Sequence, residues 1–216
     1  MSVNGRIVRT RPSAVLYARS MESIALVAAG WASGLNAYLT VLILGASGRF
    51  GWADTPASLQ TNWVLGAAGA AFVVEFIVDK IPLLDSVWDL VHTFIRPVIG
   101  GLTGAAIAAG QLGRPAGFAL AAGLALIGHL TKTTSRLAIN MSPEPFTNVI
   151  ASFAEDGVVS ALVALAMAYP RIAAISATVA AVVGVIIAFL LWKLARRGLR
   201  RVRAWLERTP ATRNSL

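Results

Sequence analysis

The sequence predicts an all-α membrane protein, a six-span helical bundle followed by a basic amphipathic helix. Apolar residues make up 56% of the 216 residues and charged residues only 13%, whereas roughly 25% of a soluble domain is charged. The apolar residues form runs long enough to cross a bilayer. Lysine and arginine gather before the first run and after the last one, as the positive-inside rule predicts for cytoplasmic ends.

The basic residues divide the chain into three parts. We expect a basic N-terminal segment at 1–21, disordered or lying on the membrane surface, a six-helix transmembrane domain at 22–192, and a basic amphipathic tail at 193–216. The net charge of +9 then reflects topology, and nucleic acid is not an expected partner. Both termini are expected to be cytoplasmic and to hold anionic lipid headgroups.

The first two expected spans cover about 22–47 and 61–80. The middle of the first reads SGLNAY at 33–38, where residues that weaken helices predict a kinked or broken helix around Asn36. Such a break is tolerated at membrane depth only where protein or a cavity covers it. The second span has small residues in its early half, which permit close helix contact, and carboxylates in its late half.

The other four spans are expected at about 86–111, 116–139, 147–169 and 172–192. The third begins with a charged face, the fourth becomes polar towards its end, and the fifth carries two carboxylates in its first half. The sixth has 21 residues without a charge. An even number of spans agrees with two cytoplasmic ends, although the loop charges do not favour either orientation.

Short internal matches suggest two inverted three-helix repeats. Ala28-Ala29-Gly30 in the first span resembles Ala121-Ala122-Gly123 in the fourth, and Thr61-Asn62 resembles Thr147-Asn148 where the second and fifth begin. Three spans in each half would place the halves in opposite orientations, as in many transporters. Polar breaks and carboxylates at corresponding positions would then mark a binding site.

Ionisable residues concentrate between the second and third spans. Residues 85, 89, 92 and 96 are spaced so that they share one face of a helix. Charged groups at membrane depth normally face a protein interior or a wet cavity. We therefore expect a substrate- or ion-binding site formed by Glu75, Asp79, Asp85, Asp89, His92 and Arg96, with Asn36 and Glu155 contributed by the other half of the protein.

Other roles are open for the same residues. Glu75 and Asp79 could instead form ion pairs with Lys80 or Arg96 that fix helix packing. Arg96 is expected to pair with Asp89, Glu75 or Glu155, and could alternatively bind an anionic substrate or a lipid phosphate. A proton relay between Asp89 and His92 is a further possibility.

Enzymatic chemistry is not expected. The chain has no cysteine and only two histidines, which excludes thiolate catalysis and makes a metal site a poor prediction. We find no nucleophile elbow, no P-loop and no paired-histidine zinc motif. The sequence therefore predicts no catalytic residues, no bound metal and no cofactor.

Several segments resemble a known protein family. They are GLNAYL in the first span, EFIVDKIPLLDSVWDLVHTFIRPVIGG at 75–101, and SPEPFTN followed by Glu155-Asp156. Together they resemble a family of small bacterial integral membrane proteins catalogued only as a domain of unknown function. The resemblance covers about 22–190 and implies a location in the bacterial inner membrane. It implies neither a substrate nor particular site residues.

Two functions follow from these observations. The first is a transporter or channel-like protein that moves protons, a cation or a small polar solute through the carboxylate-lined site. The alternative is a structural or lipid-binding membrane protein in which the charged hairpin locks helix packing. A transport site requires a water-accessible cavity, whereas a lock requires paired and dry charges. Faces of small residues suggest a homo-oligomer in either case.

Overall fold

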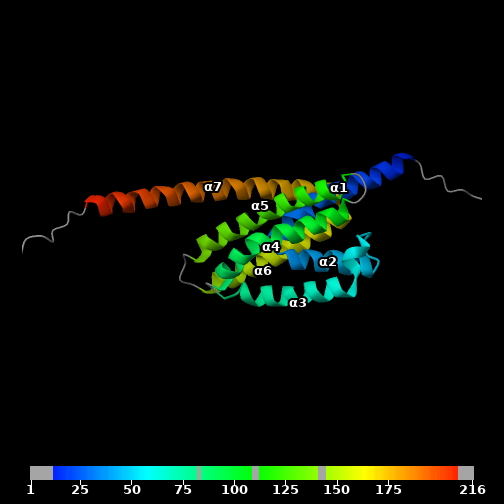
Figure 1. The fold of residues 1–216 in the computed structure, drawn as a ribbon, viewed down its shortest axis with the longest axis horizontal. Coiled ribbons are helices and arrows are strands. Elements are labelled where there is room, and N and C mark those ends of the chain that lie inside the picture. Colours follow the sequence, from blue (N-terminus) through cyan, green and yellow to red (C-terminus); the bar gives the residue numbers. More distant parts are fainter. Residues whose placement is uncertain (1–11, 82–83, 109–111, 141–144, 209–216) are drawn as a thin grey trace, which may run out of the picture.

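The computed structural model describes residues 12–81, 84–108, 112–140 and 145–208, and within them every regular element is helical. Figure 1 shows a bundle of α-helices with one short 3₁₀ helix. The all-α prediction is therefore confirmed for the described residues. The elements are α1 (Pro12–Leu35), α2 (Ala37–Arg49), η1 (Ala57–Gln60), α3 (Asn62–Val78), α4 (Leu84–Ile107), α5 (Arg114–Asn140), α6 (Pro145–Ala168) and α7 (Pro170–Arg208).

The predicted helix break lies at Asn36. This residue has extended backbone angles (φ −148°, ψ 100°), and its side-chain oxygen accepts a hydrogen bond from the backbone N–H of Leu39. An asparagine in this position caps the first turn of the following helix. Upstream, α1 begins at Pro12, so residues 12–21 are helical rather than disordered, whereas residues 1–11 lie outside the described part.

The chain reverses its direction at the break. Gly34 at the end of α1 lies against Ala125 and Gly128 of α5, whereas Gly45 in α2 lies against Leu59 near the start of α3. Hence α2 runs back towards the end of the bundle from which α1 came (Figure 1). The expectation of a single crossing over 22–47 is therefore not confirmed, because the segment is divided at Asn36 between two antiparallel helices that meet inside the bundle.

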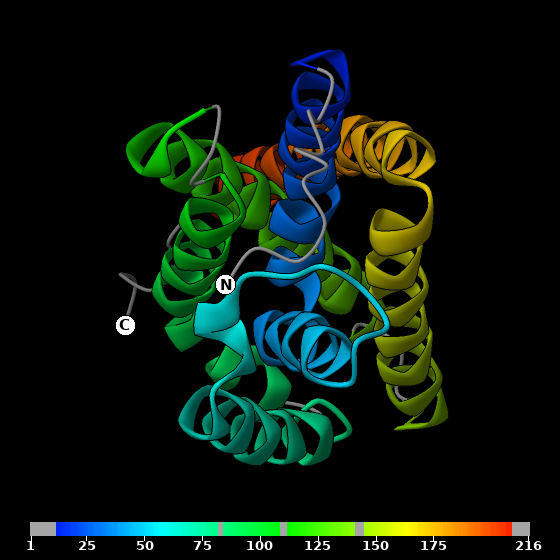
Figure 2. The same cartoon turned by 90° about the vertical axis from the view of Figure 1, so that its right-hand side faces the viewer.

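The remaining helices alternate in direction along the bundle. Four of them are long and apolar enough to cross a membrane, over Leu84–Ile107, Arg114–Leu137, Phe146–Ala168 and Pro170–Gly198. Helix α3 has 17 residues and so measures about 25 Å. Viewed end-on, α2 lies inside the bundle with α3 and α6 beside it (Figure 2). These helices indicate a multi-pass membrane protein.

Two finer topological predictions are not confirmed. Gly30 of α1 lies against Ala121 of α5, and Gly34 lies against Ala125 one turn further along, so α1 and α5 run in the same direction. An inverted repeat would require these two segments to be antiparallel. In addition, α1 begins at one end of the bundle and α7 ends at the other (Figure 1). This arrangement does not support the prediction that both termini lie on the cytoplasmic side.

Candidate functional site

Charged side chains fill the interior of the bundle, whereas its outside is apolar. Phe94 on the outside of α4 is 76% exposed, and Arg96 two residues later is 0% exposed. This inversion is expected in lipid, where ionisable groups face the protein interior. We define the charged cluster as Glu75, Asp79, Lys80, Asp85, Asp89, Arg96, Lys132, Arg136, Glu155 and Asp156.

Arg96 lies at the centre of this cluster and joins four helices. Its Nη2 donates to Glu75 Oε1 at 2.8 Å, and its Nη1 lies 3.2 Å from Asp89 Oδ1. The same Nη1 donates to the carbonyl of Gly34, at the end of α1, and to His129 Nδ1 on α5 at 2.7 Å. The predicted pairing of Arg96 with Glu75 and Asp89 is therefore confirmed.

Lys132 on α5 neutralises the carboxylates of two other helices. Its Nζ lies 2.5 Å from Asp79 Oδ2 and 3.6 Å from both Glu75 Oε1 and Glu155 Oε2. Of the ion pairs considered with Lys80 or Arg96, Glu75 forms the one with Arg96, whereas Asp79 pairs with Lys132 on the facing helix. Charge-assisted contacts of this length are among the stronger polar interactions in proteins.

Lys80 faces aromatic and polar groups instead. Its Nζ donates to the carbonyl of Phe76 at 2.8 Å and to the hydroxyl of Ser152 at 3.3 Å. It also lies 3.0 Å from the centroid of the Phe76 ring and 4.5 Å from that of Phe153. These cation–π contacts hold the ammonium group at the edge of the cluster.

Arg136 closes the cluster towards the ends of α3 and α5. It binds Glu155 through two parallel hydrogen bonds, Nε to Oε1 at 3.0 Å and Nη2 to Oε2 at 2.7 Å. Its Nη1 donates to the backbone carbonyl of Asp79 at 2.9 Å and to the side chain of Asn148, and lies 4.0 Å from Asp85 Oδ2. The forked contact with Glu155 and the contacts of Nη1 engage all three nitrogens of the guanidinium.

The break between α1 and α2 contacts another carboxylate of the cluster, that of Asp156. While Asn36 Oδ1 caps α2, its Nδ2 donates to Asp156 Oδ1 at 3.0 Å. Asp156 and its neighbour Glu155 lie on the same turn of α6 but reach different partners, Asn36 and Arg136. The helix break is thereby tied to the charged cluster through one side chain.

His92 is held in place by two hydrogen bonds. Its Nδ1 lies 2.8 Å from the carbonyl of Trp88 and donates to it, so in the neutral ring Nε2 accepts from the Tyr38 hydroxyl at 3.0 Å. The ring also stacks on Trp88, with centroids 4.5 Å apart. His92 therefore orients Tyr38 near the start of α2. Neither hydrogen bond goes to Asp89, so these contacts do not form the proton relay between Asp89 and His92.

His129 has the opposite tautomer. Its Nδ1 accepts from Arg96, and its Nε2 lies 3.0 Å from the hydroxyl of Thr93. That hydroxyl donates its own hydrogen to the carbonyl of Asp89 at 3.1 Å, so the proton between Thr93 and His129 belongs to Nε2. A chain of polar contacts thus runs from Thr93 through His129 to Arg96 and Glu75.

The carboxylates of the charged cluster outnumber its cations. Glu75, Asp79, Asp85, Asp89, Glu155 and Asp156 face Lys80, Arg96, Lys132 and Arg136. Within the described part of the chain, no hydrogen-bond donor reaches one oxygen of each of Glu75, Asp79, Asp89 and Asp156. An unbalanced charge is costly away from water, and an excess of this sign attracts protons and cations.

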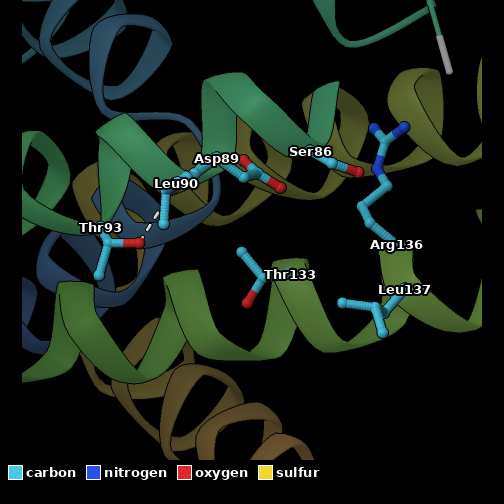
Figure 3. A pocket seen from close by; sticks show the side chains of 7 residues that line it. All are labelled: Ser86, Asp89, Leu90, Thr93, Thr133, Arg136 and Leu137. Atoms are coloured by element: carbon cyan, nitrogen blue, oxygen red, sulfur yellow. Dashed lines mark hydrogen bonds between the residues drawn. The ribbon is translucent and has the colours of Figure 1, made fainter. Parts of the chain in front are cut away.

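A cavity adjoins this cluster. It lies between α4 and α5, measures about 220 Å³, and is lined by Ser86, Asp89, Leu90, Thr93, Thr133, Arg136 and Leu137 (Figure 3). Glu75, in contrast, is wholly enclosed. Among the described residues, no three His, Asp or Glu side chains are arranged to hold a metal ion.

The structure brings all eight sequence-predicted site residues together, although their role in binding stays a prediction. Sequence reasoning did not include several others that complete the cluster. His129, Lys132 and Arg136 are spaced at i, i+3 and i+7 and share one face of α5, which is the signal that identified the face of α4. Three further residues contact these groups but are not among the predicted site residues, namely Tyr38, Asn148 and Asp156.

Comparison with protein families found a match to one family. The model of a family described as "Domain of unknown function (DUF4126)" matches residues 24–195, which include the charged cluster. Comparison with curated proteins and with solved structures found no match.

Proposed function

The chain belongs to this DUF4126 family, and we propose that it is a membrane transporter or channel-like protein for protons or a small cation. The observation that carries the proposal is the excess of carboxylates over cations in the charged cluster. A cluster of this sign attracts cations and protons and repels anions. The proposal involves no enzymatic step.

The break between α1 and α2 supports the same function. Helices interrupted at mid-membrane are a recurrent feature of ion and substrate sites in transporters, because their ends place unpaired backbone dipoles near the ligand. Here the break contacts the cluster twice, through Gly34 to Arg96 and through Asn36 to Asp156. A small movement of α2 would therefore alter the partners of both a cation and a carboxylate.

We also propose an arrangement in the membrane. The α1–α2 pair would form one re-entrant unit, which with α3 to α7 makes six membrane-embedded units. The protein would lie in a bacterial inner membrane with the basic end of α7 in the cytoplasm, where its arginines would bind anionic headgroups. Homo-oligomers could form through the exposed apolar faces. The inverted repeat is not part of this proposal.

A structural lock is the second candidate, and the pairing of the cations favours it. Arg96, Lys132 and Arg136 each contact at least one carboxylate within 3 Å, and Arg96 and Glu75 are 0% exposed. A protein of this kind would use the cluster only to hold α3, α4, α5 and α6 together, and would move no ions.

Ion flux in proteoliposomes separates the two functions. Purified protein would be reconstituted with a pH-sensitive dye, or with indicators for sodium and potassium, inside the vesicles. Asp89→Asn and Asp156→Asn preserve shape and remove one negative charge each from the cluster. Asp54→Asn is the matched control, because Asp54 is exposed in the loop before η1.

We expect wild-type protein and Asp54→Asn to move protons or a monovalent cation. Both cluster variants should retain a monodisperse size-exclusion profile and lose flux by roughly tenfold or more, as expected when an ion's counter-charge is removed. Absence of flux in the wild type for protons, sodium and potassium, with all variants folded, would leave the lock as the function and end the transport proposal.

A further inference from the structure

The cavity between α4 and α5 lies at one end of the bundle. Its walls come from the first turns of α4, at Ser86 to Thr93, and the last turns of α5, at Thr133 to Leu137. The extension of α7 beyond the bundle lies towards the same end (Figure 1). The cavity therefore lies at the end of the bundle towards which the C-terminal helix extends.

Asp89 is the carboxylate of the cluster that meets this cavity. The residue is 3% exposed, and its Oδ1 has no hydrogen-bond donor within the described part of the chain. Arg96 lies 3.2 Å from this oxygen without the geometry of a hydrogen bond. Figure 3 shows Asp89 at the space between the two helices, with Thr133 on the opposite wall. A carboxylate that lines a cavity and has one oxygen without a hydrogen-bond donor suits a proton or a cation.

The cavity wall also connects with the interior of the cluster. Thr93 lines the cavity and contacts His129, which accepts from Arg96, the partner of Glu75. Arg96 pairs with both Asp89 and the enclosed Glu75. A change of charge at Asp89 therefore alters the electrostatic environment of Glu75. The cavity and the deepest part of the cluster are electrostatically coupled.

The balance of charge favours a cation over an anion in the cavity. Arg136 reaches the wall, but Glu155 and Asn148 already occupy its guanidinium. Asp89 has less compensation, and the cluster behind it carries excess negative charge. Because the excess negative charge of the cluster behind the cavity attracts cations, a cation is favoured there over an anion such as a lipid phosphate.

We propose that this cavity is the aqueous entrance through which a proton or small cation reaches Asp89 from the side of the C-terminal helix. The inference rests on the proposed function and adds the access route, the first carboxylate on it and the side from which it opens. Leu90 and Leu137 form the exposed apolar rim, at 69% and 70% exposure. The polar floor is formed by Asp89, Thr93 and Thr133.

Cysteine accessibility tests the entrance directly, because the chain contains no cysteine. Ser86→Cys and Thr133→Cys place a thiol on each wall of the cavity. Leu102→Cys, on the same helix α4 but 60% exposed on its apolar outside, is the control for lipid-facing positions. Trp52→Cys, in the loop at the opposite end, is the control for open water. Membrane-impermeant cationic and anionic thiol reagents are added to either side, with a C-terminal tag to report orientation.

We expect Ser86→Cys and Thr133→Cys to react from the side of the C-terminal tag, and Leu102→Cys not to react. At these two positions, the rate of labelling by the cationic reagent divided by the rate with the anionic reagent should be about tenfold higher than at Trp52→Cys. Labelling at Thr133→Cys should also abolish flux. Reaction at neither wall position in folded protein, or reaction only from the opposite side, would overturn the entrance.

A measurement on the wild type keeps the test independent of variant folding. A water-soluble carbodiimide with glycinamide should modify Asp89 and exposed Asp54 but not enclosed Glu75, and excess cation should slow the reaction at Asp89. Modification of Asp54 without Asp89 would overturn the proposal. Ion flux in proteoliposomes without labelling at the cavity would refute only the proposed entrance. Labelling at the cavity without any ion flux would refute the transport function.

Discussion

Helices α4 and α5 are joined by small residues towards one end and by charged or polar side chains towards the other. At one end, Gly104 lies against Ala121 and Gly117, so that only small residues separate the two helices at this position. At the other, the same helices are joined through Arg96, His129 and other charged or polar groups. Small residues let backbones approach closely, whereas a layer of buried charges needs room for side chains and their partners. The cavity lies at the second end.

The difference shows how one helix pair can combine a rigid end with an adaptable one. Close backbone contact tolerates little change in volume. A charged layer has discrete alternative pairings, because Arg96, Lys132 and Arg136 each have more than one carboxylate within 4 Å. Function that requires rearrangement is therefore expected at the charged end, with the small-residue end as its support.

The largest expected effect comes from breaking the charged end at its centre. In Arg96→Met, Glu75 would retain only Lys132 at 3.6 Å while remaining 0% exposed. We expect a loss of about 3–5 kcal/mol in the free energy of unfolding, or failure to fold, because a buried charge would lose its partner. Unfolding by SDS titration in mild detergent measures the change.

Arg114→Met is the control for this substitution, since Arg114 is exposed at the start of α5. It should change stability by no more than about 0.5 kcal/mol. A similar stability for the two variants would mean that the pairing at the centre contributes little to the fold.

The next effect comes from the small-residue end. A methyl group at position 104 would lie 2.6 Å from the carbonyl oxygen of Gly117 and would also contact Ala121. Gly104→Ala is therefore expected to cost about 1–3 kcal/mol through overpacking. The midpoint of thermal unfolding in detergent should fall accordingly.

Gly123→Ala is the matched change on α5, where no atom lies within 4 Å of the added methyl group. It should raise stability by about 0.5–1 kcal/mol, because alanine has the higher helix propensity. Equal effects at positions 104 and 123 would show that the two helices are not in close contact.

A smaller effect is expected at the helix break. Asn36→Ala removes the 2.9 Å cap at Leu39 and the 3.0 Å hydrogen bond to Asp156, at a cost of about 1–2 kcal/mol. Hydrogen exchange should increase in the first turn of α2. Thr61→Ala, which removes the exposed 3.3 Å cap of α3, should cost less, and the reverse order would argue against the added role of Asn36 at Asp156.

The smallest effect is expected when excess charge is removed. Asp156→Asn retains an oxygen for Asn36 and removes one of the uncompensated negative charges, so stability should change by less than about 0.5 kcal/mol or increase. The same SDS titration measures it, with Asp54→Asn as the reference. A loss above about 2 kcal/mol would show that Asp156 is ionised and balanced in the folded protein.

Local patterns in the sequence predicted much of this molecule. Helical periodicity placed Asp85, Asp89, His92 and Arg96 on one face of a helix, and all four are buried on α4. The residues at 33–38 predicted the break that lies at Asn36. Both predictions depend on geometry within one or two helical turns, which residue spacing and backbone preferences determine.

Only the tertiary structure decided how these local features combine. The reversal after Asn36 depends on contacts of α1 with α5 and of α2 with α3 and η1, which a break alone does not specify. Similarly, Asp79 has Lys80 beside it in sequence but binds Lys132 on α5. Partners across helices are selected by distance and burial in the packed bundle. Sequence therefore determined which side chains face inward, while packing determined which of them meet.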